Sequence, residues 1–378
     1  MRIAYFSDFS WAQVTGIGDA LHTLMQQLNA RGHSTCFFAP SEPGHRDNAE
    51  PLAHVSLSSI GLPWAPIYRF TSPFGIPKGL KDFRPDIIHT NTYGTVGFQA
   101  VHAARSLSVP LVGTEHTMPA EYARYILNVS WMKTAMRKFA AHYYQKCDLI
   151  TAPSQMVIRE LVEDGVTKPM HVVSNPLELS LFRPLPDRDR LKAEYGITKP
   201  AILCFGRLAK EKNIEELLDA FALLKQNGTD AQLVMVGSGP AEAELRNKAH
   251  MLGIDRDIRF LGMLRGETLV EAINATDVYA IVSRSETQSM TMMQAMSCGL
   301  PVIAVNHGAL PEYIVHGENG FLAEGGNVKA IATHLAELLT DPAKRAAFGA
   351  SGRAVAAQLA PEHIAEVLEQ LYESVLKK

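Results

Sequence analysis

Short apolar runs alternate with helical patterns along this chain, and this alternation limits the fold more than any other feature of the sequence. In the first half, the runs that we expect to be strands cover residues 2–6, 35–39, 87–90, 110–113 and 149–152. Between the first two runs, apolar side chains recur with the spacing of one helix face, at Ile17, Leu21, Leu24, Met25 and Leu28. Repeated strand–helix–strand units predict a parallel sheet with helices on its faces.

The same alternation restarts after a polar, proline-rich stretch over residues 175–186. The later strands are expected at residues 201–205, 232–236, 258–262, 278–282 and 301–305, with a helix at 214–224. A chain of 378 residues is also too long for one ordinary hydrophobic core. We therefore predict an α/β protein with two Rossmann-like parallel-sheet domains, residues 1–180 and 181–360, which face each other across a ligand-binding crevice. Residues 361–378 read as one amphipathic helix.

Charge and composition exclude several classes of function. The 36 basic and 39 acidic residues give a formal net charge of −3, whereas a nucleic-acid-binding protein has a clear basic excess or stripe. No apolar run reaches the roughly 20 residues of a membrane-spanning helix, and the start of the sequence reads as a strand rather than a signal peptide. The four cysteines are too far apart for a zinc-finger or thioredoxin motif, which indicates reduced thiols. We therefore expect a cytoplasmic protein that contacts membranes only peripherally.

Two basic residues, Arg207 and Lys212, follow an expected strand and precede an expected helix. The carboxyl ends of parallel strands carry ligand sites in such folds. Both side chains are therefore candidates to clamp a diphosphate and to neutralise its charge as it leaves. The alternative is a solvated loop that happens to contain basic residues.

A second polar segment, residues 283–290, lies between an expected strand and another helix. The N–H groups at the start of a helix make an anion site suited to phosphate. Glu286 stands at this helix start, where its carboxylate can bind sugar hydroxyls. Gln294 lies eight residues further on, roughly 12 Å along a helix axis, which suits the ribose of a nucleotide sugar. The alternative is a capped helix with an exposed glutamate and a methionine-rich core face.

Two further residues are candidates because they follow strands. Gly16 lies between the first strand and the first helix, where a glycine lets a ligand approach the backbone, although a simple turn explains it equally. His116 closely follows the strand over 110–113, and catalytic side chains favour such strand ends. Leu21 stands at the third glycine position of a dinucleotide fingerprint, which argues against a nicotinamide oxidoreductase.

A metal site is not expected from the sequence. The pairs Asp187/Asp189 and Asp255/Asp257 lie in a linker and in a polar loop rather than at the end of a buried strand. Solvated carboxylate pairs of this kind are common, whereas a metal needs several converging oxygen ligands. We therefore expect neither a metal nor a bound cofactor.

In order and spacing, these segments resemble the family 4 glycosyltransferases, which are retaining enzymes of the GT-B fold. The resemblance covers nearly the whole chain. It is carried by the Gly16 turn, residues 32–33, 85–89, 205–207 with Lys212, 236–240 and 260–262, the Glu286 segment and residues 299–304. It implies that the first domain binds the acceptor, that the second binds a nucleotide sugar, and that the final helix packs back on the first domain.

The resemblance also implies roles for individual residues. The counterparts of Arg207 and Lys212 hold the diphosphate, and the counterpart of Glu286 binds the donor sugar. The counterpart of His116 lies at the reaction centre beside the acceptor. The implied catalytic residues are thus His116, Arg207, Lys212 and Glu286. The implied donor-binding residues are Gly16, Arg207, Lys212, Gly237, Glu286, Thr287, Gln288, Ser289, Met290 and Gln294.

Three positions depart from the family pattern. Gln294 replaces a usual glutamate, Ser289 a usual glycine, and Thr15 the first of a common glycine pair. Glutamine still hydrogen-bonds a ribose hydroxyl but without the charge-assisted part of that bond. We expect Ser289 to crowd the backbone near the donor. These departures leave a degenerate, non-catalytic partner subunit as the alternative to an enzyme, although the four catalytic counterparts argue for an enzyme.

The acceptor is suggested by residues 115–126 and 285–288, which are similar to diacylglycerol glucosyltransferases. Downstream of the first segment, the sequence predicts a basic amphipathic helix with Trp131 and Tyr143 beside it, suited to an anionic membrane surface. Apolar residues around Phe70 could insert as well. The expected acceptor or membrane residues are His116, Tyr122, Trp131, Lys133, Arg137 and Lys138. An ordinary helix packed on the sheet is the alternative.

These observations predict a retaining transferase that moves a hexose from a UDP-sugar to a membrane lipid such as diacylglycerol. Glucose is the hexose that we expect. It would work at the inner face of the cell membrane and would bind no nucleic acid. A cell-envelope oligosaccharide or a lipopolysaccharide is the alternative acceptor.

Overall fold

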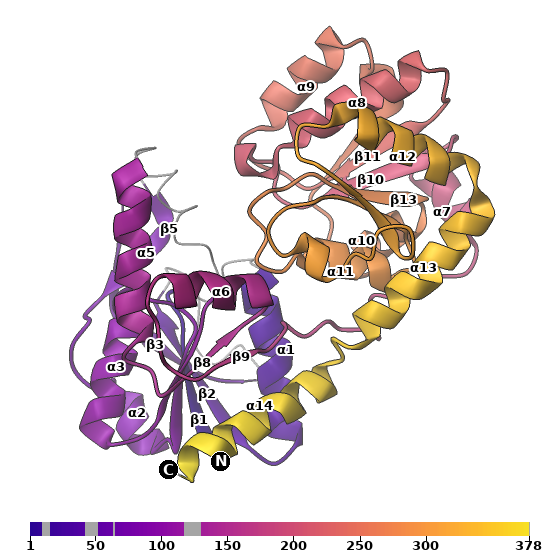
Figure 1. Ribbon diagram of the computed structural model, residues 1–378. Helices are drawn as coiled ribbons and strands as arrows, with labels where there is room; N and C mark the ends of the chain where they lie inside the picture. Colours follow the sequence, from indigo (N-terminus) through magenta and orange to yellow (C-terminus); the bar gives the residue numbers. More distant parts are fainter. Residues whose placement is uncertain (10–15, 42–51, 63–64, 117–129, 378) are drawn as a thin grey trace. The chain divides into compact units, whose positions relative to one another are not determined.

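Residues 1–9, 16–41, 52–62, 65–116 and 130–377 are described by the computed structural model of the chain (Figure 1). They form two compact units. Unit 1 comprises Met1–Pro176 together with Pro361–Lys378, and unit 2 comprises Leu177–Ala360. Each unit has its own parallel sheet and its own hydrophobic core.

Unit 1 is built on a seven-stranded sheet whose described pairings are all parallel. In spatial order the strands are β3 (Ala53–Leu57), β2 (Ser34–Pro40), β1 (Arg2–Phe6), β6 (Ile87–Thr90), β7 (Leu111–Thr114), β8 (Leu149–Ala152) and β9 (Met170–Val172). The central strands β6, β7 and β8 are buried at every residue. Helices cover both faces of the sheet, which is why these strands read as continuous apolar runs in the sequence.

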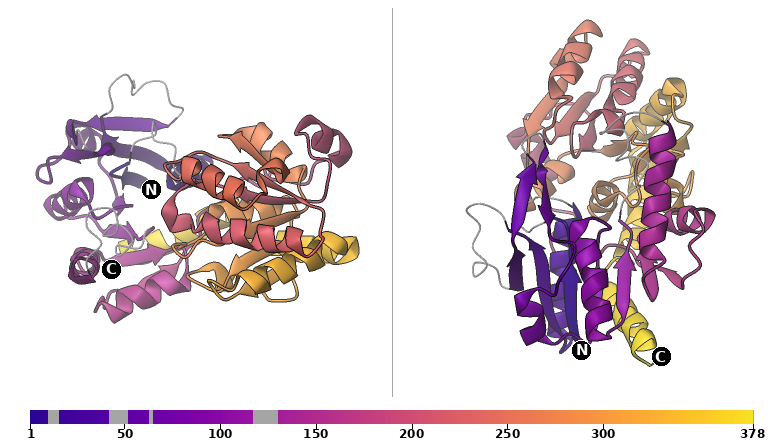
Figure 2. Two further views of the ribbon diagram at one scale, coloured as in Figure 1. Left: turned by 90° about the horizontal axis from the view of Figure 1, so that it is seen from above. Right: turned by 90° about the vertical axis from the view of Figure 1, so that its left-hand side faces the viewer.

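The helices of unit 1 are α1 (Gly16–Ala30), α2 (Lys78–Phe83), α3 (Thr95–Leu107), α5 (Ser130–Tyr144), α6 (Gln155–Glu163) and α14 (Pro361–Leu376). α1 and α14 share one core, in which Met25 and Leu368 are buried. α3, α5 and α6 contribute to the core on the other face, together with Leu80 of α2. Figures 1 and 2 show α14 running beside α1, so the last helix of the sequence completes the first unit.

A small antiparallel hairpin of β4 (Ser59–Leu62) and β5 (Ala65–Thr71) follows β3. Ile60 pairs with Phe70 across the hairpin, and both side chains are exposed. β5 also contacts α3. The hairpin was not predicted because its apolar residues do not form a run that a parallel sheet would bury.

Unit 2 repeats the same architecture with six parallel strands. In spatial order they are β12 (Ile258–Gly262), β11 (Gln232–Val236), β10 (Ala201–Phe205), β13 (Val278–Ile281), β14 (Val302–Val305) and β15 (Gly320–Ala323). Its helices are α7 (Arg188–Glu194), α8 (Ile214–Gln226), α9 (Glu242–Met251), α10 (Gly266–Asn274), α11 (Met290–Ser297), α12 (Val328–Thr340) and α13 (Pro342–Ala357). α8 packs with α9 and α12, and α11 packs with α13.

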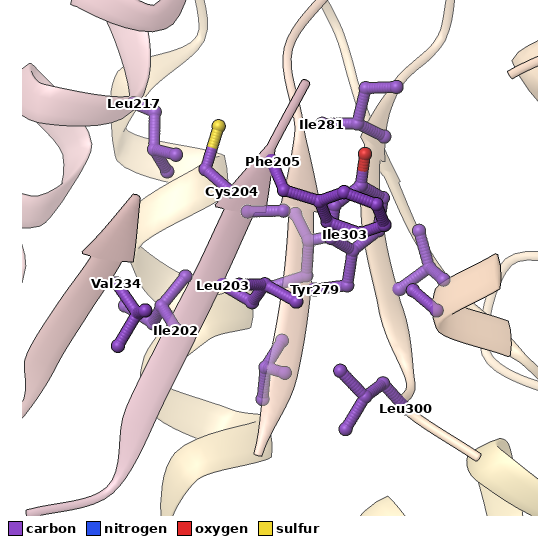
Figure 3. Close-up of a cluster of buried hydrophobic side chains, with 14 of the residues drawn as sticks. Ile202, Leu203, Cys204, Phe205, Leu217, Val234, Tyr279, Ile281, Leu300 and Ile303 are labelled. Carbon is purple, nitrogen blue, oxygen red and sulfur yellow. The ribbon is translucent and has the colours of Figure 1, made fainter. Parts of the chain in front are cut away.

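The core of unit 2 gathers side chains from neighbouring strands of this sheet. Figure 3 shows the rings of Phe205 and Tyr279 side by side, with 5.2 Å between their centroids. The Tyr279 hydroxyl is buried but contacts the Thr291 hydroxyl at 2.8 Å. A buried hydroxyl needs such a partner, so this contact ties the start of α11 to the core.

The prediction of two Rossmann-like parallel-sheet units is confirmed. The strands expected at 2–6, 87–90, 149–152 and 201–205 have the predicted limits. The strands β3, β9 and β15 were not predicted. β9 has three residues, of which two are exposed, so its sequence lacks a buried strand's apolar run. No helix in the described parts of the chain is both long and apolar enough to cross a bilayer.

Candidate functional site

The cationic segment after β10 forms a short 3-10 turn, η2 (Lys210–Lys212), before α8 begins. The Lys212 ammonium donates to Glu286 Oε1 at 2.6 Å. Arg207 forms an ion pair with Glu211 four residues later. β10 and β13 are adjacent and parallel, so the two loops that carry Lys212 and Glu286 leave the same edge of the sheet. The structure therefore brings these two predicted residues into direct contact.

Glu286 lies in the segment between β13 and α11 and is only 8% exposed. Its backbone carbonyl accepts from the Ala309 amide at 3.0 Å. Gly308 packs against the same carbonyl so closely that a Cβ would lie 2.8 Å from it, and its φ of +63° favours glycine. These contacts thus fix the backbone of Glu286, four residues before α11 begins.

Ser289 is the N-cap of α11, a position where serine is among the preferred residues. Its hydroxyl accepts from the Met292 amide at 3.3 Å, and its backbone φ is −81°. The serine side chain therefore turns back to cap the helix, and whether it crowds a donor stays a prediction. The cap also occupies one amide of the anion site predicted at the start of this helix.

The remaining predicted donor residues differ in how far they are buried. Gln288 is buried, whereas Thr287, Met290 and Gln294 are half-buried. Gly237 has a φ of +129°, and a Cβ there would lie 1.9 Å from the Gly206 carbonyl oxygen. Close packing of two backbone turns therefore explains this glycine. In unit 1, Gly16 is the first residue of α1.

Arg284 is a residue of this region that the sequence reasoning missed. Its guanidinium donates to Glu216 of α8 at 2.6 Å, and the other oxygen of Glu216 accepts from the Gly326 amide at 2.5 Å. A Cβ on Gly325 would lie 2.6 Å from Arg284 Nε, so the guanidinium lies directly on that backbone. Arg284 thus braces the segment that carries Glu286 against α8 and against the loop after β15. Its only sequence signal is a basic residue two positions before Glu286.

In unit 1, His116 lies just beyond the end of β7 and lines a small pocket. Asn91, which follows the adjacent strand β6, lines the same pocket. His116 Nε2 and Asn91 Oδ1 are 3.0 Å apart. Burial lowers the pKa of His116 to about 4, so the imidazole is neutral at neutral pH.

A buried chain of hydrogen bonds lies beside this pocket. His89 of β6 contacts the Tyr372 hydroxyl of α14 at 2.6 Å through Nδ1, and the Thr114 hydroxyl at 2.6 Å through Nε2. The chain continues to Tyr5 at 2.7 Å from Tyr372, and to Thr151 at 2.6 Å from Thr114. Burial, reinforced by the neighbouring His116 ring, lowers the pKa of His89 to about 3. Both imidazoles are thus held neutral.

The predicted membrane residues are not equivalent in the structure. Trp131 is 68% exposed, in keeping with a surface role. Arg137, however, is ion-paired with Asp164 at 2.8 Å, and this carboxylate neutralises its charge. Lys138 is exposed, and its ammonium lies 3.4 Å from the Asp164 carbonyl oxygen. Lys133 is half-buried on α5.

Two other aromatic predictions for this region have different outcomes. Tyr143 is fully buried and donates to Thr90 at 2.8 Å, so its expected place beside a membrane surface is wrong. The tyrosine is one of the side chains that join α5 to the sheet core. Tyr122 lies outside the described residues.

One aspartate of each pair has a structural partner. Asp257 contacts Lys199 and Lys225, both at 2.9 Å, and Asp187 caps α7 through the Arg190 amide. Across the described residues, no group of three or more histidine, cysteine or acidic side chains is arranged to hold a metal ion.

The lowered pKa values of His116 and His89 predict how the stability of unit 1 depends on pH. Below pH 6.5 the unfolded chain binds protons that the folded chain does not accept until about pH 4 or below. The stability contributed by these two histidines is therefore fully present above pH 6.5 and decreases as pH falls towards 4, by about 1.4 kcal/mol per pH unit for each histidine.

Urea unfolding followed by tryptophan fluorescence measures this dependence, because all three tryptophans belong to the sequence of unit 1. His116→Gln should reduce the slope of the unfolding free energy against pH, between pH 6.5 and 4, by about 1.4 kcal/mol per pH unit relative to the unsubstituted chain. Identical slopes in the two proteins would show that His116 titrates normally in the fold.

Comparison with known proteins assigns the chain to a family. Residues 14–181 match Glycosyltransferase Family 4, and residues 187–355 match Glycosyl transferases group 1. The chain is 29% identical over 323 residues to the alpha-monoglucosyldiacylglycerol synthase of Streptococcus pneumoniae, with 82% of this chain and 71% of that protein aligned. It is 31% identical over 364 residues to the sulfoquinovosyl transferase SQD2 of Arabidopsis thaliana, with 93% and 69% aligned.

A solved structure shares the fold of the whole chain. The crystal structure of Anabaena HepE in complex with UDP has a TM-score of 0.82 to this chain at 21% identity, covering 99% of this chain and 100% of HepE. Both halves of the sequence match glycosyltransferase families, and both units have the parallel sheets of the GT-B fold. The chain is therefore a glycosyltransferase of the GT-B fold and belongs to the family 4 and group 1 enzymes.

Proposed function

We propose that the chain transfers glucose from UDP-glucose to a membrane lipid such as diacylglycerol, with retention of the anomeric configuration and without a divalent metal. The observation that carries the donor half of the proposal is the contact between Lys212 and Glu286 beside Arg207. The similarity to an alpha-monoglucosyldiacylglycerol synthase supports the acceptor half.

The donor site would use the ion pair of Lys212 and Glu286. A diphosphate bound to Lys212 takes over the ammonium group, and the Glu286 carboxylate then accepts hydrogen bonds from sugar hydroxyls. Arg207 adds a second cation as negative charge develops on the departing diphosphate. Two fixed cations would thereby supply the charge stabilisation that a divalent metal supplies in other transferases.

The acceptor side would lie in unit 1 at His116. Because this imidazole is neutral, it exchanges hydrogen bonds with hydroxyl groups rather than attracting an anion. A lipid or saccharide hydroxyl is therefore the acceptor group that the site suits. A charged acceptor group would have to enter a buried environment without a cationic histidine to pair with it.

The lipid part of the proposal is supported by exposed apolar side chains of unit 1, among them Ile60, Phe70, Phe74, Trp131 and Phe139. Several lie on elements joined through α3: β5 contacts this helix, the Phe74 ring lies 6.5 Å from His102, and the Phe139 ring lies 5.6 Å from Phe98. Exposed aromatic residues next to Lys138 suit the interface of an anionic bilayer.

The first test concerns the donor. Isothermal titration with UDP-glucose, GDP-mannose and NAD, each with and without EDTA, should show binding of UDP-glucose that the chelator leaves unchanged. Strict dependence on a divalent metal, tight binding of NAD, or no nucleotide binding would contradict the proposed donor site. Transfer by the loaded enzyme should give the α-anomer from α-linked UDP-glucose, and an inverted product would contradict retention.

The roles of the two cations are tested by substitution. Lys212→Ala and Arg207→Ala should each lower kcat by about 10²–10³-fold, since each removes charge that stabilises the leaving diphosphate. Lys210→Ala is the matched control, because Lys210 lies in the same turn but is 75% exposed and pairs with Glu244. Turnover like that of the unsubstituted enzyme in either test variant would remove that residue from its proposed role.

Membrane binding is tested by liposome flotation. Binding should increase with the fraction of anionic lipid and fall with salt, because each basic residue near the surface contributes about 1 kcal/mol. Lys133→Ser with Lys138→Ser should weaken the dependence on lipid charge, and Trp131→Ser should weaken binding to all vesicles. Adding Arg137→Ser to this double variant should weaken binding by less than the loss of an unpaired basic residue would, because the Arg137 guanidinium already pairs with Asp164.

The control for this assay is Met251→Ser, which removes an exposed apolar side chain from unit 2. It should leave flotation unchanged. Absence of any vesicle binding, together with transfer to a soluble saccharide, would move the acceptor from lipid to a cell-envelope oligosaccharide or lipopolysaccharide.

A further inference from the structure

The structure brings Asn91 against His116 at the edge of the unit 1 sheet. β6 and β7 are paired in parallel, so the residues that follow them meet at one edge. Asn91 is 4% exposed. Its backbone N–H donates to the Phe6 carbonyl at 2.8 Å, which fixes the backbone at this residue. Its side-chain oxygen lies 3.0 Å from His116 Nε2, and both residues line the same pocket.

This contact has a consequence for the proton on the imidazole. A carboxamide oxygen can only accept a hydrogen bond, so the ring nitrogen that faces it must carry the proton. The imidazole is neutral and carries one proton, which leaves Nδ1 as the acceptor nitrogen. The other end of the Asn91 amide, Nδ2, is buried and has no hydrogen-bond partner among the described residues.

We propose that Asn91 is a positioning residue, which holds His116 in the Nε2–H form and thereby presents Nδ1 as an acceptor for a hydroxyl group. The proposal rests on the proposed function, in which that hydroxyl belongs to the donor sugar or to the acceptor. The buried Nδ2 group of Asn91 is a second donor at the same pocket and suits a hydroxyl or ether oxygen of the same ligand. Together the two side chains form a recognition unit for a neutral polyol.

The opposite tautomer would present an N–H group instead of a lone pair to the ligand hydroxyl. Two donors would then face each other unless the hydroxyl rotated to offer its oxygen. Either arrangement loses the hydrogen bond that orients the reacting group, and an unpaired buried polar group reduces a rate by about 10- to 100-fold. The effect should appear in kcat more than in KM if the contact orients the reacting hydroxyl.

The tautomer is measured directly by NMR of the full chain labelled with ¹⁵N-histidine, with the His116 signals assigned by their loss in His116→Gln. The unsubstituted chain should show the proton on Nε2. Asn91→Leu removes the acceptor oxygen and should populate the Nδ1–H form. Asn91→Asp keeps an acceptor oxygen at the same place and should restore the Nε2–H form.

The kinetic arm uses the same variants. Asn91→Leu should lower kcat by about 10- to 100-fold, and Asn91→Asp should recover part of that loss. Gln99→Leu is the matched control, because Gln99 is another buried amide of unit 1, on α3 and outside the pocket. It should change neither the His116 tautomer nor kcat.

The outcomes separate this proposal from the proposed function. A proton on Nδ1 in the unsubstituted chain, or a tautomer unchanged in Asn91→Leu, overturns the positioning role. A changed tautomer with unchanged kcat overturns its part in transfer. If no donor and acceptor pair gives transfer, the proposed function fails, and the NMR arm still decides what Asn91 does to His116.

Discussion

Both candidate sites depend on the parallel pairing of buried strands. In unit 2, β10 lies beside β13, and this pairing brings Lys212 to Glu286 across 74 positions of sequence. In unit 1, β6 lies beside β7, and Asn91 meets His116 across 25 positions. An antiparallel neighbour would send its following loop to the opposite edge of the sheet. The polar groups therefore converge because the apolar strands between them pair in one direction.

Carboxylates balance several of the cations at the edge of unit 2. Among the described residues, the pairs are Arg207–Glu211, Lys212–Glu286 and Arg284–Glu216. A partly buried charge without a partner is costly, so these carboxylates stabilise the arrangement of the edge. Under the proposed function, a diphosphate competes with Glu211 and Glu286. It does not replace Glu216, whose second oxygen also holds the Gly326 amide. Under that function the three pairs would differ in role, since two would respond to the donor and one would hold the loop.

The sequence predicted those parts of the fold and site that leave a local pattern. Buried strands give apolar runs, and Lys212 and Glu286 stand at fixed distances from such runs. Arg284 and Asn91 leave no comparable pattern. Their importance comes from partners on other elements, Glu216 and His116, and spacing within one segment does not reveal those contacts.

Surface charge was harder to predict for the same reason. Lys133, Arg137 and Lys138 look alike on a helical projection of α5, yet Asp164 from the segment after α6 pairs with Arg137. Tyr143 belongs to the same helix and is turned into the core, where it meets Thr90. A helical projection shows which side chains share a face but not which element covers that face. The charge available to a membrane is therefore set by tertiary contacts.

The last helix shows how far this dependence extends. α14 buries its apolar face against α1, as its amphipathic sequence predicts, but Tyr372 adds a polar group to that buried face. Its hydroxyl is satisfied only because Tyr5 and His89 meet it there, at 2.7 and 2.6 Å. His89 in turn uses its second nitrogen on Thr114, two residues before His116. A shift of α14 along the sheet would leave these buried groups unpaired, which costs more than the loss of an exposed contact. The hydrogen-bond chain therefore fixes the register of α14, and it ties that register to β7, the strand that ends two residues before His116.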